Sequence, residues 1–324
     1  MIIYRKYNHE NDYDLYKSFC EKNFGKNCYQ SKIEHINWLE SNKSHFINLA
    51  VKENEILGCF HGFEAPVRIN NETHIFCSLH DLMVDRAKGS QIGLKLMQEG
   101  ILQDNPVILS GAIGRISRAY QRLGSTQFQS HWYRKFIFPS NPLRFFFLKD
   151  RFIKSVQNEM KFNFISNKDK NSKTQIRSVI NSYKYDDDFS EKFFEWRLFQ
   201  SDSPLTFFAF DDSFKNVIVF TLGLRGRIPF LRIMSVIKDS DKILSDLLKS
   251  IERFASKIGI PVILYSVTED IPPPKNLKYN KYRDMPNSFV YSNKKNLLNN
   301  FFISGFSTDL GFDSLFYKGI DEKI

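Results

Sequence analysis

The stretch VDRAKGSQIGLKLM, residues 84–97, determines how the first half of the chain is organised. It follows an apolar, strand-like run, and its own apolar residues recur at helical spacing, which predicts a helix over residues 91–103. A turn between a strand and a helix gathers unpaired backbone N–H groups at the positive end of the helix dipole. Gly89 and Gly93 allow the backbone of such a turn to approach a ligand closely. The stretch therefore predicts a site for an anion.

The segments on either side of this turn predict a mixed sheet. Three strand-like runs come before it, over residues 45–53, 55–66 and 73–84, and their short connections are typical of an antiparallel meander. A buried strand over residues 106–112 follows the predicted helix, and a further helix ends before Gly124, a residue suited to a C-terminal cap. The order strand, turn, helix, strand places the first parallel crossover at the glycine turn.

The same order of elements partly recurs in the second half of the chain. The predicted strands and one long helix cover residues 205–210, 216–224, 228–236, 241–257 and 261–267. The tetrapeptide PVIL follows a predicted helix in both halves, which favours a duplicated fold. A polar stretch at residues 166–174 indicates a linker or exposed loop. We therefore expect an α/β chain with two domains, residues 1–150 and 151–324, each a mixed, mostly antiparallel sheet flanked by helices.

Composition narrows the classes of function. The chain has 324 residues and a formal net charge of +10, which suits an anionic partner such as a phosphorylated cofactor. It lacks a long Lys/Arg block and any zinc-finger spacing, so a solvated basic surface is favoured over a nucleic-acid interface. The four cysteines are widely spaced and form no CxxC pair, so we expect neither a disulfide framework nor a bound metal.

The hydrophobic segments predict a cytoplasmic protein without a membrane span. The N-terminus lacks the apolar core of a signal peptide, and no stretch reaches the roughly 20 apolar residues that a span requires. The aromatic run LRFFFLKDRF, residues 143–152, is short and flanked by charge. It therefore predicts a buried strand or inter-domain packing rather than a patch in contact with lipid.

Two segments resemble the GNAT superfamily of acyl-CoA N-acyltransferases. The first is MVDRAKGSQIGLKLM, which is similar to the family's pyrophosphate-binding segment, Gln/Arg-x-x-Gly-x-Gly/Ala, with Lys88 at the first position and Gly93 at the last. Gln91 stands where the family has its middle glycine. The second is AYQRLGSTQF, residues 119–128, which resembles the Tyr-x-x-Leu-Gly-Phe region after the family's fifth strand.

The resemblance implies a set of residues that bind acetyl-CoA or another acyl-CoA. In the family, the strand before the turn pairs its backbone with the pantetheine arm, and the turn holds the pyrophosphate. The corresponding residues here are Leu82, Met83, Val84, Lys88, Gly89, Ser90, Gln91, Ile92 and Gly93.

The resemblance also implies catalytic residues. Tyr120 stands where the family has the tyrosine that protonates the leaving thiolate, although a core tyrosine explains it equally well. A base is expected on the strand before the turn, which offers His80 and Asp81. Strand alternation places these two on opposite faces, Asp81 with Met83 and His80 with Leu82. We favour Asp81, because a carboxylate can also orient an amine; the alternative is that it only braces the turn.

The second half resembles a degenerate GNAT-like unit. Where the phosphate turn belongs, the chain has no glycine and carries Asp239 and Asp241, so we expect no coenzyme A there. The segment FFEWRLFQSDSP is similar to tandem GNAT-like proteins of bacterial surface-polysaccharide clusters. Tyr279, Tyr282 and Phe289 are candidates either for stacking on a sugar ring or for the core. This half is expected to bind the acceptor or to serve a structural role.

The function expected from the resemblance is transfer of an acyl group, such as acetyl, from acyl-CoA directly to a primary amine. The polysaccharide association suggests an amino sugar as the acceptor. One alternative is a transferase of the peptidoglycan cross-bridge type, which would take aminoacyl-tRNA and use the positive charge for it. Another is a GNAT-like binding module without catalysis.

Overall fold

The computed structural model forms two compact units. The first comprises Met1–Phe128, Pro286–Phe302 and Ser307–Asp309, and the second comprises the remainder. The sequence placed a single boundary near residue 150, whereas the first change of unit falls between Phe128 and Gln129. The structure describes residues 1–26, 28–85, 90–101, 105–112, 114–128, 130–169, 171–185, 187–200, 203–225, 227–281, 287–292 and 301–308.

The first unit is built on an eight-stranded sheet. Seven strands follow the order β1-β2-β3-β4-β5-β14-β6, and β15 pairs with β3. Only β4 and β5 are parallel among these pairs, which confirms the predicted meander and the first parallel crossover. The strands are β1 (Ile3–Lys6), β2 (Phe46–Lys52), β3 (Glu55–Ile69), β4 (Glu72–Val84), β5 (Val107–Ala112), β6 (Thr126–Phe128), β14 (Asn287–Tyr291) and β15 (Phe301–Phe302).

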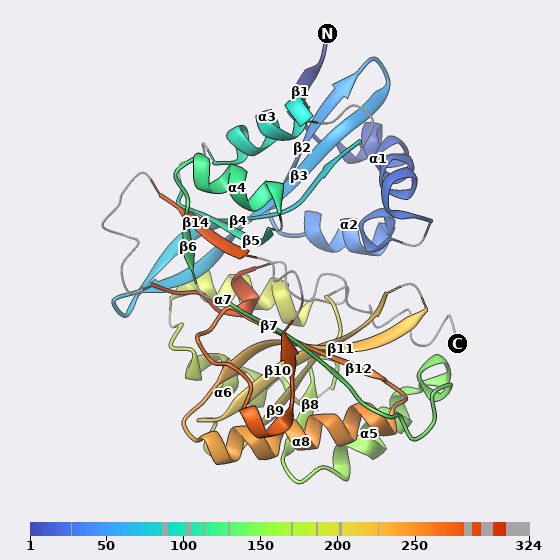
Figure 1. Ribbon diagram of the computed structural model, residues 1–324, viewed down its shortest axis with the longest axis vertical. Coiled ribbons are helices and arrows are strands. Elements are labelled where there is room, and N and C mark those ends of the chain that lie inside the picture. Colours follow the sequence, from blue (N-terminus) through green and yellow to red (C-terminus); the bar gives the residue numbers. More distant parts are fainter. Residues whose placement is uncertain are drawn as a thin grey trace. The chain divides into compact units, whose positions relative to one another are not determined.

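Helices cover both faces of this sheet (Figure 1). One face packs against α1 (His9–Phe24), the short helix η1 (Tyr29–Ser31) and α2 (Ile33–Glu40), and the other against α3 (Ser90–Ile101) and α4 (Arg115–Arg122). Each face has its own apolar core: Tyr16, Phe19, Ile36, Leu49 and Met83 on the first, and Leu79, Ile92, Leu96, Tyr120 and Phe289 on the second.

The first helix is capped by a side chain outside it. Asn8 caps α1 by accepting a hydrogen bond from the Asn11 N–H, and Asp12 lies inside the helix. Asp12 is buried and accepts two hydrogen bonds from the Arg5 guanidinium at 2.6 Å. The carboxylate therefore joins α1 to β1 instead of starting the helix.

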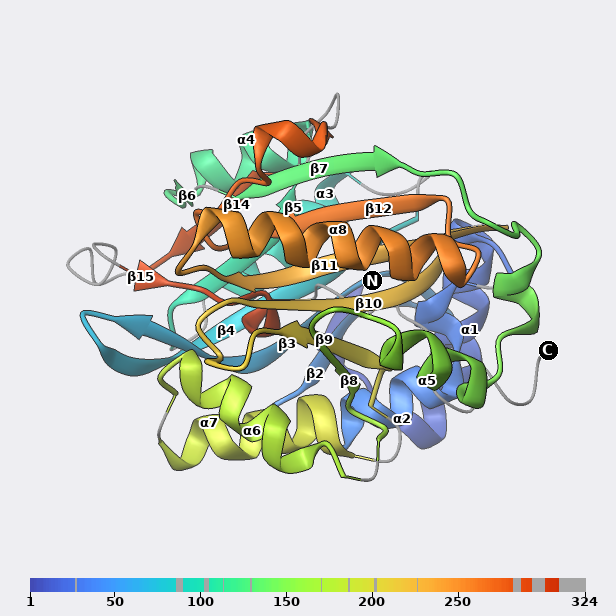
Figure 2. The ribbon, with the colours of Figure 1, turned by 90° about the horizontal axis from the view of Figure 1, so that it is seen from below.

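The second unit repeats this architecture around a seven-stranded sheet, in the order β13-β7-β12-β11-β10-β9-β8. β11 and β12 are its parallel pair, and the long helix α8 lies over β10, β11 and β12 (Figure 2). Its strands are β7 (His131–Phe136), β8 (Asn163–Ser166), β9 (Thr206–Phe210), β10 (Val217–Arg225), β11 (Ile228–Ile237), β12 (Val262–Val267) and β13 (Asn280–Lys281). Its helices are η2 (Arg144–Phe147), α5 (Asp150–Asn158), α6 (Lys173–Ser182), α7 (Asp188–Phe194), the π-helix η3 (Glu195–Phe199), α8 (Asp241–Lys257) and η4 (Lys275–Leu277).

The chain changes unit several times along its length. β7 precedes the rest of the second unit, while β14 follows it in sequence and lies between β5 and β6 of the first. A further change falls within the short helix η6 (Gly305–Ser307). The polar stretch at residues 166–174, expected as a linker or an exposed loop, joins β8 to α6 inside the second unit and so does not link the two units.

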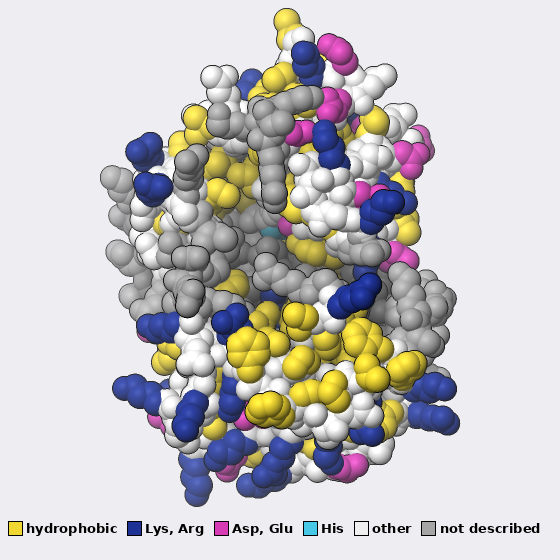
Figure 3. Space-filling view, turned by 45° about the vertical axis from the view of Figure 1, so that its right-hand side comes forward, with side chains coloured by type: hydrophobic (Ala, Val, Ile, Leu, Met, Phe, Trp, Pro, Cys, Tyr) yellow, Lys and Arg dark blue, Asp and Glu magenta, His cyan; other side chains and the backbone are white. Residues whose placement is uncertain are grey.

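The aromatic run at residues 143–152 forms η2 and the start of α5, so its prediction as a strand is wrong. Phe145 and Leu148 are buried, but Phe146 and Phe147 are 38% and 68% exposed. Figure 3 shows hydrophobic side chains gathered on one face of the second unit, with Lys and Arg around them. None of the helices in the described part of the chain has the length and apolarity to cross a membrane.

Candidate functional site

The parallel strands of the first unit separate partway along their length. β4 and β5 pair from Cys77 opposite Val107 to Leu79 opposite Leu109, and their register ends there. β4 nevertheless continues to Val84 and β5 to Ala112. Two adjacent strands that stop pairing before they end leave a space that side chains or a ligand fill.

A cavity of about 240 Å³ lies where these strands separate. Its walls come from β3, β4, β5, α3 and α4, so every element around the predicted crossover contributes. The lining residues are Phe60, Leu79, His80, Asp81, Leu82, Leu96, Met97, Ala112, Ile116 and Tyr120. Three of these were predicted to be catalytic, and the fold brings all three to one cavity.

A β-bulge places Asp81 and His80 side by side. β3 opposes Asp81 and Leu82 with Phe60 alone, and Asp81 has a φ of 47°. The extra residue breaks the alternation of the strand, so the prediction that His80 and Asp81 lie on opposite faces is wrong, as is the pairing of His80 with Leu82. An Asp81 carboxylate oxygen lies 3.3 Å from His80 Nδ1. The bulge therefore brings the two candidate bases into contact with each other.

Asp81 is held by three neighbours. One carboxylate oxygen accepts hydrogen bonds from the Tyr29 hydroxyl at 2.7 Å and from Gln30 Nε2 at 3.0 Å, and the other faces His80. Burial alone would raise the pKa of Asp81, but the hydrogen bond to His80, the neighbouring His80 and His61 imidazoles and the Tyr29 hydroxyl outweigh it and hold the pKa well below its usual range. The carboxylate is therefore an anion at neutral pH, oriented by η1 and by its own strand.

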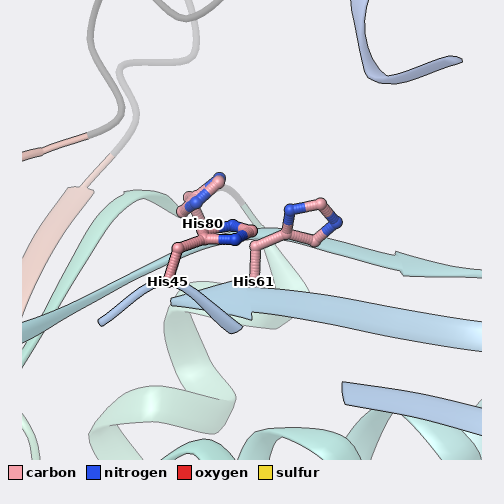
Figure 4. Close-up of side chains that lie close together, drawn as sticks. All are labelled: His45, His61 and His80. Carbon is pink, nitrogen blue, oxygen red and sulfur yellow. The ribbon is translucent and has the colours of Figure 1, made fainter. Parts of the chain in front are cut away.

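Three histidines gather on the face of the sheet that α1, η1 and α2 cover. His61 lies directly opposite His80 in the β3–β4 register, and His45 immediately precedes β2 (Figure 4). Ring centroids are 5.1 Å apart for His61 and His80 and 5.5 Å apart for His45 and His61. The Tyr16 hydroxyl lies 2.9 Å from His61 Nε2. Burial, followed by the neighbouring imidazoles, lowers the pKa of both His45 and His61 well below the usual value.

Sequence reasoning found His80 but missed His45, His61, Tyr16 and Tyr29. These residues are far apart along the chain, and no spacing rule joins a residue before β2 to one in β3 and one in β4. The only signal available was strand alignment. Once the meander is assumed, His61 and His80 become cross-strand neighbours, although the bulge determines which face later residues take.

Tyr120 lies on α4, is 8% exposed, and lines the cavity. Its ring packs against Phe289 of β14, with centroids 5.9 Å apart. Phe289 is fully buried, so it belongs to the core of the first unit and not to a sugar-stacking surface. Tyr279 packs against the core of the second unit, and Tyr282 lies outside the described residues. Tyr120 is thus both a core tyrosine and a residue that reaches the cavity.

The predicted cofactor residues of β4 face in different directions. Leu82 lines the cavity, and both Leu82 and Val84 pack towards α3 and α4. Met83 is buried in the core on the opposite face, beside α1. A role for Met83 in cofactor binding would therefore fall to its backbone.

The predicted phosphate turn is described only at its helical end. α3 begins at Ser90, Gln91 is exposed, and Ile92 is buried. A Cβ added to Gly93 would lie 3.2 Å from a methyl group of Val84, so this helix packs closely on β4 at that point. Lys88 and Gly89 lie outside the described residues.

The corresponding turn of the second unit is occupied by a side chain. Asn216 Oδ1 accepts hydrogen bonds from the backbone N–H groups of Asp239 and Ser240, at 3.0 and 2.9 Å. Ser240 then caps α8 by accepting a hydrogen bond from the Ile243 N–H. These donors are the groups that an anion would need.

Comparison with known structures identifies similar folds. The N-myristoyltransferase of Saccharomyces cerevisiae, solved with bound myristoyl-CoA, aligns with a TM-score of 0.59 and 9% identity over 99% of this chain and 83% of its own. A tandem GNAT protein from the clavulanic acid biosynthesis pathway aligns with a TM-score of 0.55 and 9% identity over 90% of this chain and 98% of its own.

The name of a third similar structure includes a sugar substrate. It is a GCN5-related glucosamine N-acetyltransferase region in a fungal multi-domain β-N-acetylglucosaminidase, with a TM-score of 0.54 and 13% identity over 90% of this chain and 38% of that one. No protein-family model matches the sequence, and no curated protein does. At such low identities, the likeness establishes a shared fold.

Proposed function

We propose, from the premise that the chain has the tandem GNAT fold, that its first unit transfers an acyl group from acyl-CoA to a primary amine. The observation that carries the proposal is the cavity between β4 and β5, which brings His80, Asp81 and Tyr120 together. Its 240 Å³ is slightly below the roughly 300–1,000 Å³ of pockets that enclose drug-sized ligands. A cavity of that size can hold the two reacting groups, the thioester and the amine, while the remainder of each substrate lies outside it.

In this proposal Asp81 binds the acceptor amine. Its side chain is 10% exposed, whereas the His80 side chain is fully buried, so Asp81 is the member of the pair that a substrate can reach. A carboxylate with a lowered pKa attracts a substrate ammonium and keeps it beside the thioester. His80 acts as a positioning residue, because it fixes one carboxylate oxygen. Because the pKa of Asp81 is lowered, this carboxylate orients the ammonium, and one ammonium proton passes to water before the amine attacks.

Tyr120 is the candidate proton donor to the departing thiolate. It approaches the cavity from α4, across from the β4 residues that hold the amine. A positioned hydroxyl in a water-poor site is suited to this step. The acyl group passes directly from sulfur to nitrogen: the C–N bond forms, the C–S bond breaks, the thiolate takes a proton from Tyr120, and the second proton that the nitrogen loses returns to Tyr120 through water.

The cofactor would extend from the cavity along β4 to the N-terminus of α3. Beyond Leu79 the β4 backbone has no register with β5, so a pantetheine arm can add to it as an extra strand. The side chain of Gln91 is exposed, so it lies outside the core at the start of α3. Lys88, Gly89 and Ser90 complete the proposed pyrophosphate site.

We propose a structural or acceptor-binding role for the second unit. Asn216 occupies its helix N-terminus, and Asp239 and Asp241 add negative charge there. Both features disfavour a second pyrophosphate. An amino sugar is the acceptor we favour, since one structure with this fold is named a glucosamine N-acetyltransferase region.

Binding of acetyl-CoA tests the proposal. Calorimetric titration gives its dissociation constant, and at about 100 times that concentration the ligand should stabilise the protein by roughly 2.7 kcal/mol in a thermal-shift assay. The Gly93→Asp variant should lose the shift, because it adds bulk against Val84 and a negative charge at the turn. Leu94→Asp is the matched control: it places the same charge on the exposed side of α3 and should bind normally.

The chemical step needs a separate measurement. Tyr120→Phe should bind acetyl-CoA with unchanged affinity and reduce turnover of a glucosamine acceptor by about 100-fold or more. Binding of aminoacyl-tRNA in the absence of acyl-CoA binding would favour the cross-bridge alternative. Binding of neither at millimolar acyl-CoA would overturn the enzyme proposal.

A further inference from the structure

Three imidazoles lie close together, those of His61 and His80 on adjacent strands and that of His45 immediately before β2. The candidate ligand atoms of His45, His61 and His80 all lie within 4.8 Å of one another (Figure 4). The sheet fixes this arrangement, because His61 and His80 are cross-strand neighbours and His45 precedes the next strand. Positions on neighbouring strands hold their Cβ atoms at nearly constant separation. The cluster is therefore a rigid feature of the fold.

The second nitrogen of two of these rings is already engaged. His80 Nδ1 faces the Asp81 carboxylate at 3.3 Å, and His61 Nε2 lies 2.9 Å from the Tyr16 hydroxyl. Metal-ligating histidines commonly direct their other nitrogen to a carboxylate or hydroxyl in this way, which fixes the ring orientation. Asp81 and Tyr16 thus supply the outer contacts of a metal site.

Two ring nitrogens within the cluster have no such contact. His61 Nδ1 and His45 Nε2 are buried, and neither has a hydrogen-bond partner among the described residues. His61 is fully buried. A buried polar atom without a partner destabilises the folded chain, so two in one cluster call for a ligand that both can bind.

We propose that His45, His61 and His80 bind a divalent transition-metal ion of the zinc class. Imidazole nitrogens coordinate zinc at about 2.0–2.1 Å, which places tetrahedral ligand atoms about 3.4 Å apart. Shifts of less than about 1 Å per ring bring the three nitrogens to that separation from their present 4.8 Å or less. Three protein ligands leave one position for water or another small ligand.

The charge around the cluster suits a cation. The Asp81 carboxylate, whose side chain is 10% exposed, lies next to the cluster and offsets part of the charge that a divalent ion brings into the interior. Three neutral nitrogens select zinc, cobalt, nickel or copper over magnesium and calcium, which require oxygen ligands. This site could not be predicted from the sequence, because the three residues match no metal-binding spacing. The inference does not rest on the proposed acyl transfer.

Cobalt titration of the tag-free, chelator-treated full chain tests the site. We expect one equivalent of Co²⁺ to give the visible absorption of tetrahedral coordination, and Zn²⁺ to displace it. His45→Gln should weaken binding by at least 100-fold. Its partly exposed position makes the substitution tolerable for folding, which thermal melting without metal verifies. His74→Gln is the control on β4, and it should bind as the parent does.

Asp81→Asn separates an outer contact from a ligand. It should keep the cobalt spectrum and weaken affinity about 10- to 100-fold, as loss of an outer carboxylate does. All these measurements are made without acyl-CoA, so they stand or fall apart from the enzyme assay. Absence of a cobalt band together with no Zn²⁺ effect on melting would overturn the proposal. So would parental affinity in His45→Gln.

Discussion

Each unit contains one parallel strand pair that separates partway along, and the two spaces are used differently. In the first unit β4 and β5 separate beyond Leu79, and a cavity of about 240 Å³ lies there. In the second, the register of β11 and β12 ends at Ile233 opposite Tyr265. Just beyond that point, the Tyr183 hydroxyl forms a hydrogen bond of 2.7 Å with the Ser235 hydroxyl. Ser235 in turn donates a hydrogen bond to the Glu269 carboxylate.

The difference teaches that one backbone device can either hold a ligand or be filled by the protein. Tyr183 and Ser235 are essentially inaccessible to solvent, and Phe306 packs against the Tyr183 ring at 5.8 Å. The N-terminus of α8 is also filled by the protein, because Asn216 accepts hydrogen bonds from the backbone N–H groups there. In the second unit, side chains of the chain itself thus take the places where the first unit is proposed to hold substrates.

Filling the open space should have the largest effect. Ala112→Phe places a ring in the cavity from β5 and makes the first unit resemble the second. We expect acyl transfer to fall by at least about 100-fold, since displacement of a reacting group by about 1 Å already has that effect. Turnover and acetyl-CoA affinity are measured side by side.

Ala112→Ser is the matched control for that experiment, because it changes the same position without filling the space. It should retain activity within a few-fold of the parent. Full activity in Ala112→Phe, with melting unchanged, would show that the cavity is not the site of transfer.

Removing the hydroxyl that fills the second space should affect stability only. Tyr183→Phe leaves Ser235 and Glu269 buried without this hydrogen bond, which should lower the free energy of unfolding by about 1–3 kcal/mol. Urea denaturation measures it, with Tyr4→Phe on a partly exposed strand as the control. A loss of acyl transfer equal to that of Ala112→Phe would contradict the division of roles.

Lowering the pH should destabilise each unit, because one carboxylate in each becomes protonated. Hydrogen bonds from Arg5 lower the pKa of Asp12 in the first unit. In the second, burial opposes but Asn216 and its neighbours outweigh it, lowering the pKa of Asp211. A group with a lowered folded pKa stabilises above its unfolded value of about 3.9, and the contribution disappears as pH falls through the folded value.

Asp12→Asn and Asp211→Asn should therefore each destabilise by about 1 kcal/mol at pH 7 and approach the parent near pH 2. Denaturation curves at both pH values measure this change. A difference that persists undiminished at low pH would exclude the carboxylate charge as its origin.

Cysteine labelling distinguishes the units without any substitution. All four cysteines lie in the first unit, and Cys20, Cys59 and Cys77 are buried. Burial raises the pKa of Cys77 to about 12 and keeps it a thiol at neutral pH. Cys28, which is partly exposed, should react first with a thiol reagent, and the other three should follow only as the first unit opens. Equal rates at all four would indicate that this unit is open in solution.

The sequence predicted the elements well and the site only in part. Hydrophobic periodicity is local, so it located the meander, the helix after Val84 and the parallel crossover, and these predictions are confirmed. The bulge at Asp81 could not be predicted, because one extra residue within an unbroken apolar run leaves no compositional mark. That single residue determines which candidate bases meet.

Pairing between strands that are far apart in the sequence was the other feature that could not be predicted. β14 lies between β5 and β6, yet nothing near residues 287–291 distinguishes a strand of the first unit from one of the second. The histidine cluster escaped for a similar reason, since strand register and not chain spacing assembles it. The predicted roles of Tyr120, Asp81 and Gly93 stay predictions until the experiments above are made.

The place of β14 has a consequence for the order in which the protein is made. A ribosome adds about 5–20 residues per second, so the roughly 160 residues between β6 and β14 take on the order of 10–30 s to appear. Until then β5 presents an open edge, and β6 has no β14 partner in its sheet. The sheet of the first unit is therefore completed only when nearly the whole chain has been made, and until then its open β5 edge is free to pair with another strand.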